Sequence, residues 1–310
     1  MGGYLSPPAA HDSSEAMDFS SEELRELVFH ALAEDLGQGD LTTRVTLPGA
    51  MQARGTFNSK QELVVAGLPI ARKVFEILDP SLEWQDGVEE GAEVDPATPL
   101  ASVHGAAGSL LAGERVALNF LQHLSGIATY ARRLKDELAG THAEFLDTRK
   151  TTPGLRSLQK YAVRVGGGRN HRLRLDDGIL IKGNHLRLVG GIRTAIQRAL
   201  QQRPAGYHVE VEITCLQELE EAIDAGADGV LLDNMSPAEV RECVQRAEGR
   251  VRLEVSGGID TSNIRAYAQA GVDFISVGAL THSAAAVDIN FRIAPLAGNG
   301  TWDTGHGDGH

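Results

Sequence analysis

The chain has 310 residues, of which 42% are hydrophobic and 23% are charged, a composition typical of a folded globular protein. Its formal net charge of −13 argues against nucleic acid or an anionic membrane surface as the main partner. No apolar run reaches the roughly 18 residues of a membrane span, and no secretory signal pattern opens the chain. The two cysteines lack metal or redox spacing, so we expect a cytoplasmic protein without disulfides.

The first helix is predicted after a tail without periodicity. Residues 1–17 are rich in small and polar residues, and the segment 297–310 is rich in Gly and His, so we expect disordered tails at both. Ser20 and Glu23 have the spacing of a capping box, and apolar residues recur behind them at helical spacing. Gly37 indicates where this helix ends.

Between about residues 50 and 105 the pattern is mixed. Short apolar runs bounded by Gly and Pro alternate with one helical segment; the runs are at 52–58, 62–66 and 99–104, and the helix at 68–78. This mixture is typical of a small sheet with helices on one face, and we expect an N-terminal α+β domain over 18–115. A long helix follows at about 110–138, with a break expected near Gly126.

From residue 143 the rhythm becomes regular. Short apolar strands are predicted at 143–147, 178–182, 208–214, 228–233, 251–256 and 273–278, with helices at 193–202, 216–225, 237–247 and 261–270. Alternating strands and helices indicate βαβ units and a parallel sheet. A barrel is the natural closure of so many units, and six clear strands favour an irregular or incomplete one. We expect this α/β barrel domain over 116–296.

Charged or phosphate-binding residues follow nearly every predicted strand of this region. They are Asp147 to Lys150, Lys182, Glu212, Asp233, Ser256 to Gly258, and Gly278 with Ala279. In parallel barrels the functional groups gather at these carboxyl ends of the strands. The segment 149–187 is also strongly basic within an acidic protein, which indicates a pocket for a small, multiply charged anion; a solvated helix face is the alternative.

The glycine turns after the last two strands, and the acidic residues Glu212 and Asp233, can each be interpreted in more than one way. Glycine-rich turns after the final barrel strands commonly bind phosphate through bare backbone N–H groups, although backbone geometry alone can also require glycine. Glu212 and Asp233 could hold Mg²⁺ and sugar hydroxyls, stabilise positive charge on a ribose ring, or be structural carboxylates. His171, between Asn170 and Arg172, is a structural hydrogen bonder or an anion ligand.

Several long segments, in order, resemble the quinolinate phosphoribosyltransferase family from about residue 20 to 293. The segments are EDLGQGDLTT at 34–43, GERVALNFLQHLSGIAT at 113–129, DTRKTTPGLRSLQKYAVRVGGGRNHR at 147–172, ILIKGNH at 179–185, VEVE at 209–212, LLDN at 231–234, LEVSGGI at 253–259 and ISVGALTHS at 275–283. The resemblance implies an N-terminal α+β sandwich domain, an irregular open α/β barrel and a homodimer. The implied reaction joins quinolinate to the phosphoribosyl group of phosphoribosyl pyrophosphate with Mg²⁺, giving nicotinate mononucleotide, pyrophosphate and CO₂.

The resemblance also implies roles for individual residues. Arg149, His171 and Arg172 would bind the quinolinate carboxylates, with Arg115 reaching in from the partner subunit. The other implied site residues are Lys150 and Lys182 at substrate anionic groups, Glu212 and Asp233 at the ribose and its metal, and Ser256, Gly257, Gly258, Gly278 and His282 at the ribose phosphate; Lys150, Glu212 and Asp233 would be catalytic. Gly183 stands where many relatives carry an acidic or polar residue, which leaves the other site residues intact.

Three other functions compete with this one. A related phosphoribosyltransferase could use another heteroaromatic acid, because the sequence does not locate the second carboxylate. A phosphate-binding barrel lyase or isomerase should show an acid–base pair and less basic charge. A barrel kept only for binding or assembly would not need competent residues at every implied catalytic position.

Overall fold

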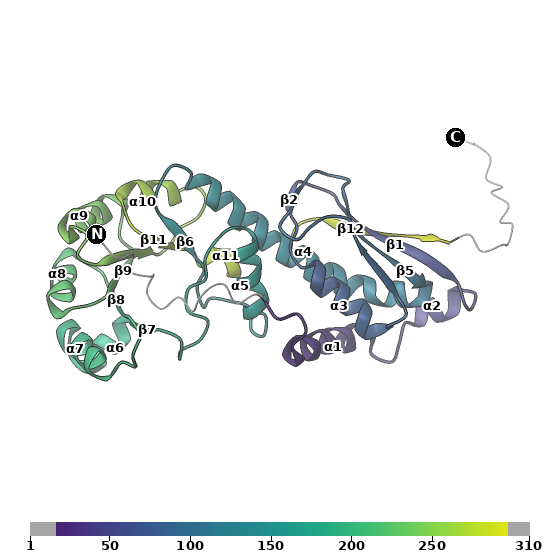
Figure 1. Ribbon diagram of the computed structural model, residues 1–310, viewed down its shortest axis with the longest axis horizontal. Helices are drawn as coiled ribbons and strands as arrows, with labels where there is room; N and C mark the ends of the chain where they lie inside the picture. The colour runs from purple at the N-terminus through teal and green to yellow at the C-terminus, as the bar shows by residue number, and fades with distance from the viewer. Residues whose placement is uncertain (1–16, 297–310) are drawn as a thin grey trace. The chain divides into compact units, whose positions relative to one another are not determined.

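The computed structural model describes residues 17–296, which fall into two compact units (Figure 1). Among the described residues, the antiparallel unit comprises Phe19–Glu62, Gly67–Gln122 and residues 288–296, and the parallel unit comprises Leu63–Ala66 and His123–Val287. The tails predicted at 1–17 and 297–310 lie, apart from Met17, outside the described residues. The predicted domain limits stay predictions. No helix within residues 17–296 is long and apolar enough to cross a bilayer.

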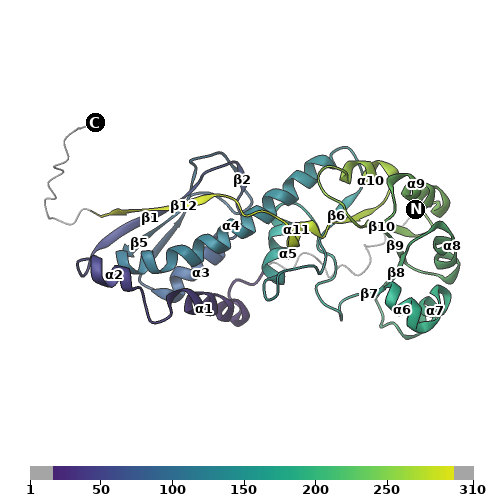
Figure 2. The same ribbon diagram turned by 180° about the vertical axis from the view of Figure 1, so that it is seen from behind.

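The antiparallel unit is a four-stranded sheet covered by helices (Figure 2). The strand order is β12-β1-β5-β3, with β1 at Gln52–Ser59, β3 at Glu83–Asp86, β5 at Pro99–Ala106 and β12 at Ile289–Pro295. The helices are α1 at Glu22–Leu36, α2 at Leu41–Thr46, α3 at Leu68–Leu78 and the first part of α4 at Ala107–Glu137; β4 is Glu93–Val94. Neither β3 nor β12 was predicted from the sequence.

Aromatic side chains form the centre of this unit. Phe57 of β1 is opposite Phe291 of β12 in the strand register, and the two ring centroids are 4.4 Å apart. Phe75 of α3 and Trp84 of β3 pack onto the same group, with ring centroids 6.1 Å apart. Fully burying such side chains stabilises a fold by roughly 1.5–3 kcal/mol each, so β12 is part of this core although it lies far away in the sequence.

Helix α1 begins one residue later than predicted. The N-cap is Ser21 rather than Ser20, because the Ser21 hydroxyl accepts a hydrogen bond from the Leu24 backbone N–H at 3.4 Å. Leu24, Val28 and Leu32 are buried, as the helical spacing predicted. Gly37 ends the helix with a φ of 51°, a conformation that glycine adopts without strain.

The break predicted near Gly126 is wrong, because α4 runs without interruption through this position. Glycine is needed there for close contact with another segment. A Cβ atom at residue 126 would lie 2.2 Å from the backbone oxygen of Ala285. The sequence signal was therefore real, but it marks a close approach of two backbones and not the end of a helix.

A Gly126→Ala variant should lose about 1–3 kcal/mol of unfolding free energy, as overpacked sites do. Alanine gains about 1 kcal/mol of helix propensity over glycine, but the backbone carbonyl of Ala285 cannot move aside as a flexible side chain could. Gly108→Ala is the matched control, since its Cβ would meet only a Thr43 methyl group at 3.5 Å. Urea unfolding measures both, and equal stability of the two variants would contradict this explanation.

The parallel unit is a six-stranded, fully parallel sheet in the order β6-β11-β10-β9-β8-β7. The strands are β6 at Glu144–Leu146, β7 at Ile179–Ile181, β8 at Val209–Ile213, β9 at Gly229–Asp233, β10 at Arg252–Ser256 and β11 at Phe274–Ser276; β2 is Leu63–Val64. All six predicted strands and the parallel fold class are confirmed. Strands β6 and β7 are the two edges, so the barrel is open.

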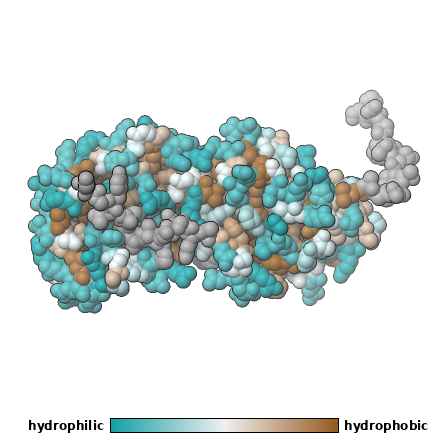
Figure 3. Space-filling model, in the orientation of Figure 1, coloured by the Kyte–Doolittle hydropathy of each residue, from teal (hydrophilic) through white to brown (hydrophobic). Residues whose placement is uncertain are grey.

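Helices cover the outer face of this sheet (Figures 1 and 2). They include α7 at Ile192–Gln202, α8 at Leu216–Ala225, α9 at Pro237–Ala247 and α10 at Ile264–Ala270; the other helices of the unit are α5 at Arg156–Val165, α6 at Gly183–Val189 and α11 at Ala279–His282. Most of the surface drawn in Figure 3 is hydrophilic, with scattered apolar residues. The sheet's inner face is where the site is built.

Strand β8 shows how the inner face becomes polar. Val209, Val211 and Ile213 are buried and share one face of the strand, while Glu210 and Glu212 share the other. The register pairs Glu212 with Leu231 of β9, and Leu231 with Glu254 of β10. The carboxylates of Glu212 and Glu254, on two strands separated by β9, therefore lie on the same inner face.

Candidate active site

The strand ends bring two predicted pairs of residues together. The Lys182 ammonium, after β7, lies 2.6 Å from Glu212 Oε2 at the end of β8, and the Gly183 N–H donates to Glu212 Oε1 at 3.3 Å. On the next strands the Ser256 hydroxyl donates to Asp233 Oδ1 at 2.9 Å. A Cβ atom at residue 183 would lie 3.8 Å from Glu212 Oε1, an ordinary van der Waals contact, so the space there does not require glycine.

The two glycine turns lie where the sequence placed them. Gly257 has a φ of 108°, and a Cβ there would be 2.3 Å from the Asn234 side-chain oxygen, so only glycine fits. At Gly278 a Cβ would meet the Lys150 side chain at 3.1 Å and His282 Nε2 at 3.2 Å. Lys150, Gly278 and His282 are therefore neighbours, although more than 120 residues separate the first from the others.

Two arginines form a concentrated positive charge beside these ends. Burial and the nearby charge of Arg149 lower the pKa of Arg172. Arg172 Nη1 donates to the Gly178 carbonyl at 2.9 Å, which fixes one side of its guanidinium. Arg149 Nε is buried and has no hydrogen-bond partner. A buried donor without an acceptor costs about 1–3 kcal/mol, so a ligand that supplies an acceptor is favoured here.

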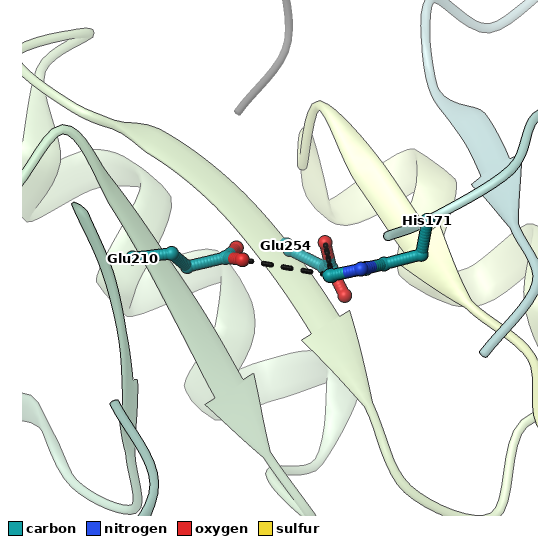
Figure 4. Close-up of side chains that lie close together, drawn as sticks. All are labelled: His171, Glu210 and Glu254. Carbon is teal, nitrogen blue, oxygen red and sulfur yellow. Dashed lines mark ion pairs between the residues drawn. The ribbon is translucent and has the colours of Figure 1, made fainter. Parts of the chain in front are cut away.

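His171 lies among buried acids on the inner face (Figure 4). Its Nε2 is 3.6 Å from Glu210 Oε2 and also 3.6 Å from Glu254 Oε2. Its Nδ1 accepts a hydrogen bond from the Arg172 backbone N–H at 2.7 Å. Both ring nitrogens thus face groups of the chain itself, and the predicted contact of His171 with a substrate carboxylate stays a prediction.

The protonation of this cluster follows from burial and mutual charge. Burial lowers the pKa of His171, but the charges of Glu254 and Glu210 outweigh it and raise that pKa to about 9. Burial and the charge of Glu210 raise the pKa of Glu254 to about 7.

Comparison with models of known protein families identifies the family of this chain. The family model described as quinolinate phosphoribosyl transferase, C-terminal domain, matches residues 127–292, and the model of the N-terminal domain matches residues 40–125. The chain belongs to the quinolinate phosphoribosyl transferase family.

Individual members of the family are similar to this chain over nearly its whole length. A probable nicotinate-nucleotide pyrophosphorylase [carboxylating] of Synechocystis is 43% identical over 266 residues, 84% of this chain and 90% of the relative. One from Bacillus subtilis is 41% identical over 271 residues, 87% of this chain and 93% of the relative. The solved nicotinate-nucleotide pyrophosphorylase of Francisella tularensis superimposes with a TM-score of 0.84 at 40% identity, covering 88% of this chain and 96% of that one.

In this family member, sequence reasoning missed a buried network under the basic loops. Asp147 and Lys160 are 0% and 1% exposed and form an ion pair. The Lys160 ammonium also donates to the His171 carbonyl at 2.7 Å, and the His171 N–H donates to Asp147 Oδ1 at 3.0 Å. Burial raises the pKa of Asp147 and lowers that of Lys160, and the attraction between the two groups opposes both shifts.

The carboxylates of the family member fit the Mg²⁺ that the sequence predicts. Glu212 and Asp233 offer hard oxygen ligands, and Mg²⁺ typically takes one or two protein carboxylates and fills its shell with water and substrate oxygens. Glu212 already accepts from Lys182 and Gly183, and Asp233 from Ser256 and Asn234. Each carboxylate oxygen has two lone pairs, so acceptor capacity remains on both residues.

Proposed function

We propose that this protein transfers the phosphoribosyl group of phosphoribosyl pyrophosphate to quinolinate and releases CO₂, giving nicotinate mononucleotide and pyrophosphate for NAD biosynthesis. The observation that carries the proposal is the Arg149–Arg172 pair, with a buried Arg149 Nε that has no acceptor in the chain. Two guanidinium groups close enough to act on each other's charge suit a small dianion, and membership of the family names quinolinate as that dianion. The cytoplasm is the compartment we propose for this reaction.

The phosphate end of the donor is assigned to the glycine turns. Gly257 and Gly258 both have positive φ values, and the backbone N–H groups of such glycine turns commonly bind phosphate. Lys150 and His282 flank Gly278 and supply positive charge and a ring N–H to the same anion. These donors would hold the ribose phosphate and place the anomeric carbon toward the inner face of the barrel.

The acids act on the charge that develops on the ribose. When pyrophosphate leaves, the sugar becomes oxocarbenium-like, and Glu212 and Asp233 stabilise this positive charge electrostatically. Mg²⁺, when bound, neutralises the charge of the departing pyrophosphate. Lys182 holds Glu212 in place by its ion pair, and we assign it to an anionic group of the substrate. Holding the pyridine nitrogen in line with the anomeric carbon supplies much of the rest, since good orientation gains roughly 7–11 kcal/mol.

Decarboxylation then follows from the product of the first step. Once the pyridine nitrogen carries the ribose, the ring is a cation, and the bond from the adjacent ring carbon to its carboxylate can break. The electron pair stays on that carbon, the neighbouring positive nitrogen stabilises it, and a proton replaces the CO₂. No side chain acts as a nucleophile in this sequence of steps.

We also propose a homodimer in which Arg115 completes the partner's site. Arg115 is exposed on α4, one helical turn after Leu111, an apolar side chain that is 37% exposed. Mixing an Arg115→Ala chain with a Glu212→Ala chain should therefore restore activity, to about a quarter of the wild type if random mixing leaves one intact site per mixed dimer. Verified mixed dimers without any recovered activity would exclude shared sites.

One assay tests the reaction itself. Purified protein is incubated with quinolinate, phosphoribosyl pyrophosphate and Mg²⁺, and CO₂ and nicotinate mononucleotide are measured together. Equal amounts of both, absent without the donor, are the expected result. Ribosylation of nicotinate or another heteroaromatic acid without CO₂ would refute quinolinate as substrate and favour a related phosphoribosyltransferase.

A further inference from the structure

Gln159 is a buried amide that joins two segments of the candidate site. It is 0% exposed and belongs to the first turn of α5, which lies beside α11 in both views of the chain (Figures 1 and 2). Its Oε1 accepts a hydrogen bond at 2.9 Å from the Thr152 N–H, on the loop after β6. Its Nε2 donates to the Thr281 carbonyl of α11 at 3.2 Å. A buried amide is costly unless it is hydrogen-bonded, and here its two ends bind segments more than 120 residues apart.

The two backbone groups fix the orientation of this amide. A backbone N–H can only donate and a carbonyl can only accept, so the amide oxygen must face Thr152 and the nitrogen must face Thr281. The nitrogen is also 3.0 Å from Thr152 Oγ1 and 2.9 Å from His123 Nε2 on α4. Burial lowers the pKa of His123, which favours a neutral ring with a lone pair for this contact. Gln159 is therefore held from three segments at once.

Thr281 extends this link to the residues assigned to the ribose phosphate. Its hydroxyl donates to the Lys150 carbonyl at 2.8 Å, and its backbone N–H donates to the Gly278 carbonyl at 3.1 Å. Lys150 and His282 flank Gly278, since a Cβ at residue 278 would meet the Lys150 side chain at 3.1 Å and His282 Nε2 at 3.2 Å. Hydrogen bonds thus connect Gln159 without interruption to both segments that would bind phosphate.

We propose that Gln159 is a positioning residue for the ribose phosphate, which holds the loop 148–152 and the turn at Gly278 at a fixed separation without touching the substrate. The inference rests on the proposed function, in which these two segments bind the donor. An anion held between two segments is bound less tightly when their separation varies, because binding must then also order them. The complete burial of Gln159 excludes a direct contact of its side chain with a substrate in the site.

The quinolinate side of the same loop is held by a different residue. Arg156, three residues before Gln159 on α5, donates to the Leu173 carbonyl at 3.2 Å and to the Arg149 carbonyl at 3.5 Å. Arg149 is assigned to quinolinate, and Leu173 directly follows the other arginine of that site. These contacts do not pass through the Gln159 amide. Its loss should therefore weaken binding of the ribose phosphate more than binding of quinolinate.

A Gln159→Met variant tests the proposal by a split between two affinities. Methionine fills a similar space but offers no partner to Thr152 or Thr281. We expect the KM for phosphoribosyl pyrophosphate to rise about tenfold, the equivalent of about one hydrogen bond, and the KM for quinolinate to stay within about twofold. Gln201→Met, an exposed position on α7, is the matched control and should change neither value. An unchanged KM for phosphoribosyl pyrophosphate, or an equal rise of both KM values, would overturn the proposal.

Two substitutions of Thr281 test the second step of the link. Thr281→Val keeps the shape of the side chain and removes the hydroxyl that donates to Lys150, so the KM for phosphoribosyl pyrophosphate should rise. Thr281→Ser keeps the hydroxyl and should stay within about twofold of the wild type. The same KM in both variants would contradict a role of the hydroxyl in positioning Lys150.

A buried side chain of the antiparallel unit controls for loss of stability. Ser59 is 2% exposed; its hydroxyl donates to the Asp95 carbonyl at 2.6 Å and accepts from the Thr98 N–H at 3.0 Å. Ser59→Ala should lower the unfolding temperature and leave both KM values unchanged. A split of the KM values in Ser59→Ala like that in Gln159→Met would show that loss of stability alone is the cause, against the proposal.

Two probes that do not react keep this inference separate from the proposed function. Ribose 5-phosphate represents the phosphate end of the donor, and phthalate, an aromatic dicarboxylate, represents quinolinate; calorimetry measures the dissociation constant of each. In Gln159→Met the constant for ribose 5-phosphate should rise about tenfold and that for phthalate should stay within about twofold. This split would support the inference even in a protein that released no CO₂ from quinolinate. Equal constants for ribose 5-phosphate in wild type and Gln159→Met, or no binding of it by the wild type, would overturn the inference.

Discussion

A Lys160→Met variant is expected to lose about 3–5 kcal/mol of unfolding free energy, the cost of removing one partner of a buried ion pair. Asp147 is fully buried, and without the ammonium its carboxylate would keep only neutral donors, the Asn170 amide and the His171 N–H. At pH 7 the group must then stay charged without a counter-ion or take up a proton. Thermal and urea unfolding both measure this loss.

Two controls show whether the buried charge is the cause. Lys60→Met removes an ammonium that is paired with Asp288 at 3.3 Å, but both side chains are more than half exposed. Exposed pairs contribute about 0–1 kcal/mol, so this variant should remain close to the wild type. Adding Asp147→Asn to Lys160→Met removes the orphaned charge and should recover part of the stability. Equal losses in Lys160→Met and Lys60→Met would show that burial does not matter here.

The same variant should also affect the site, because Lys160 donates to the His171 carbonyl. Its loss loosens the segment that carries Arg172. The Lys160 ammonium therefore contributes both to the stability of the fold and to the position of the residues that bind quinolinate. We expect the KM for quinolinate to rise even at temperatures where Lys160→Met is fully folded.

The parallel sheet could be predicted from the sequence because each of its strands is a local apolar run followed by a helix. Strand β12 was missed for the opposite reason. Its alternation of Ile289, Phe291 and Ile293 is a signal for a strand, but its partner β1 lies more than 200 residues earlier. Local patterns indicate that a strand exists and say little about which distant sheet receives it.

The sequence predicts candidate site residues where charged residues follow the end of a strand. It does not predict the buried acids Glu210 and Glu254. Val209 to Glu212 alternate in the way that usually indicates a strand with one solvated face, yet Glu210 is buried. Lys160 likewise resembled one more basic residue of a solvated helix, although the whole run Leu158–Val163 is buried. The residue type alone does not show whether a charged side chain is paired inside the protein or exposed to water.

Arg149→Met should reduce kcat/KM for quinolinate by roughly 100-fold to 10,000-fold, because two charge-assisted hydrogen bonds are worth about 1.5–3 kcal/mol each. Stability should not fall with activity. Arg149 Nε is buried without an acceptor, so the wild-type protein bears a desolvation cost that a methionine side chain removes. We therefore expect an unfolding temperature equal to or above that of the wild type.

Arg198→Met, an exposed position on α7, is the control for loss of one positive charge and should leave both kinetics and stability unchanged. The opposite signs expected for activity and stability separate a ligand-binding arginine from a structural one. A structural Arg149 would lower the unfolding temperature together with kcat/KM, and added quinolinate would stabilise wild type and Arg149→Met equally. If Arg149 binds a carboxylate, quinolinate should raise the unfolding temperature of the wild type and much less that of Arg149→Met.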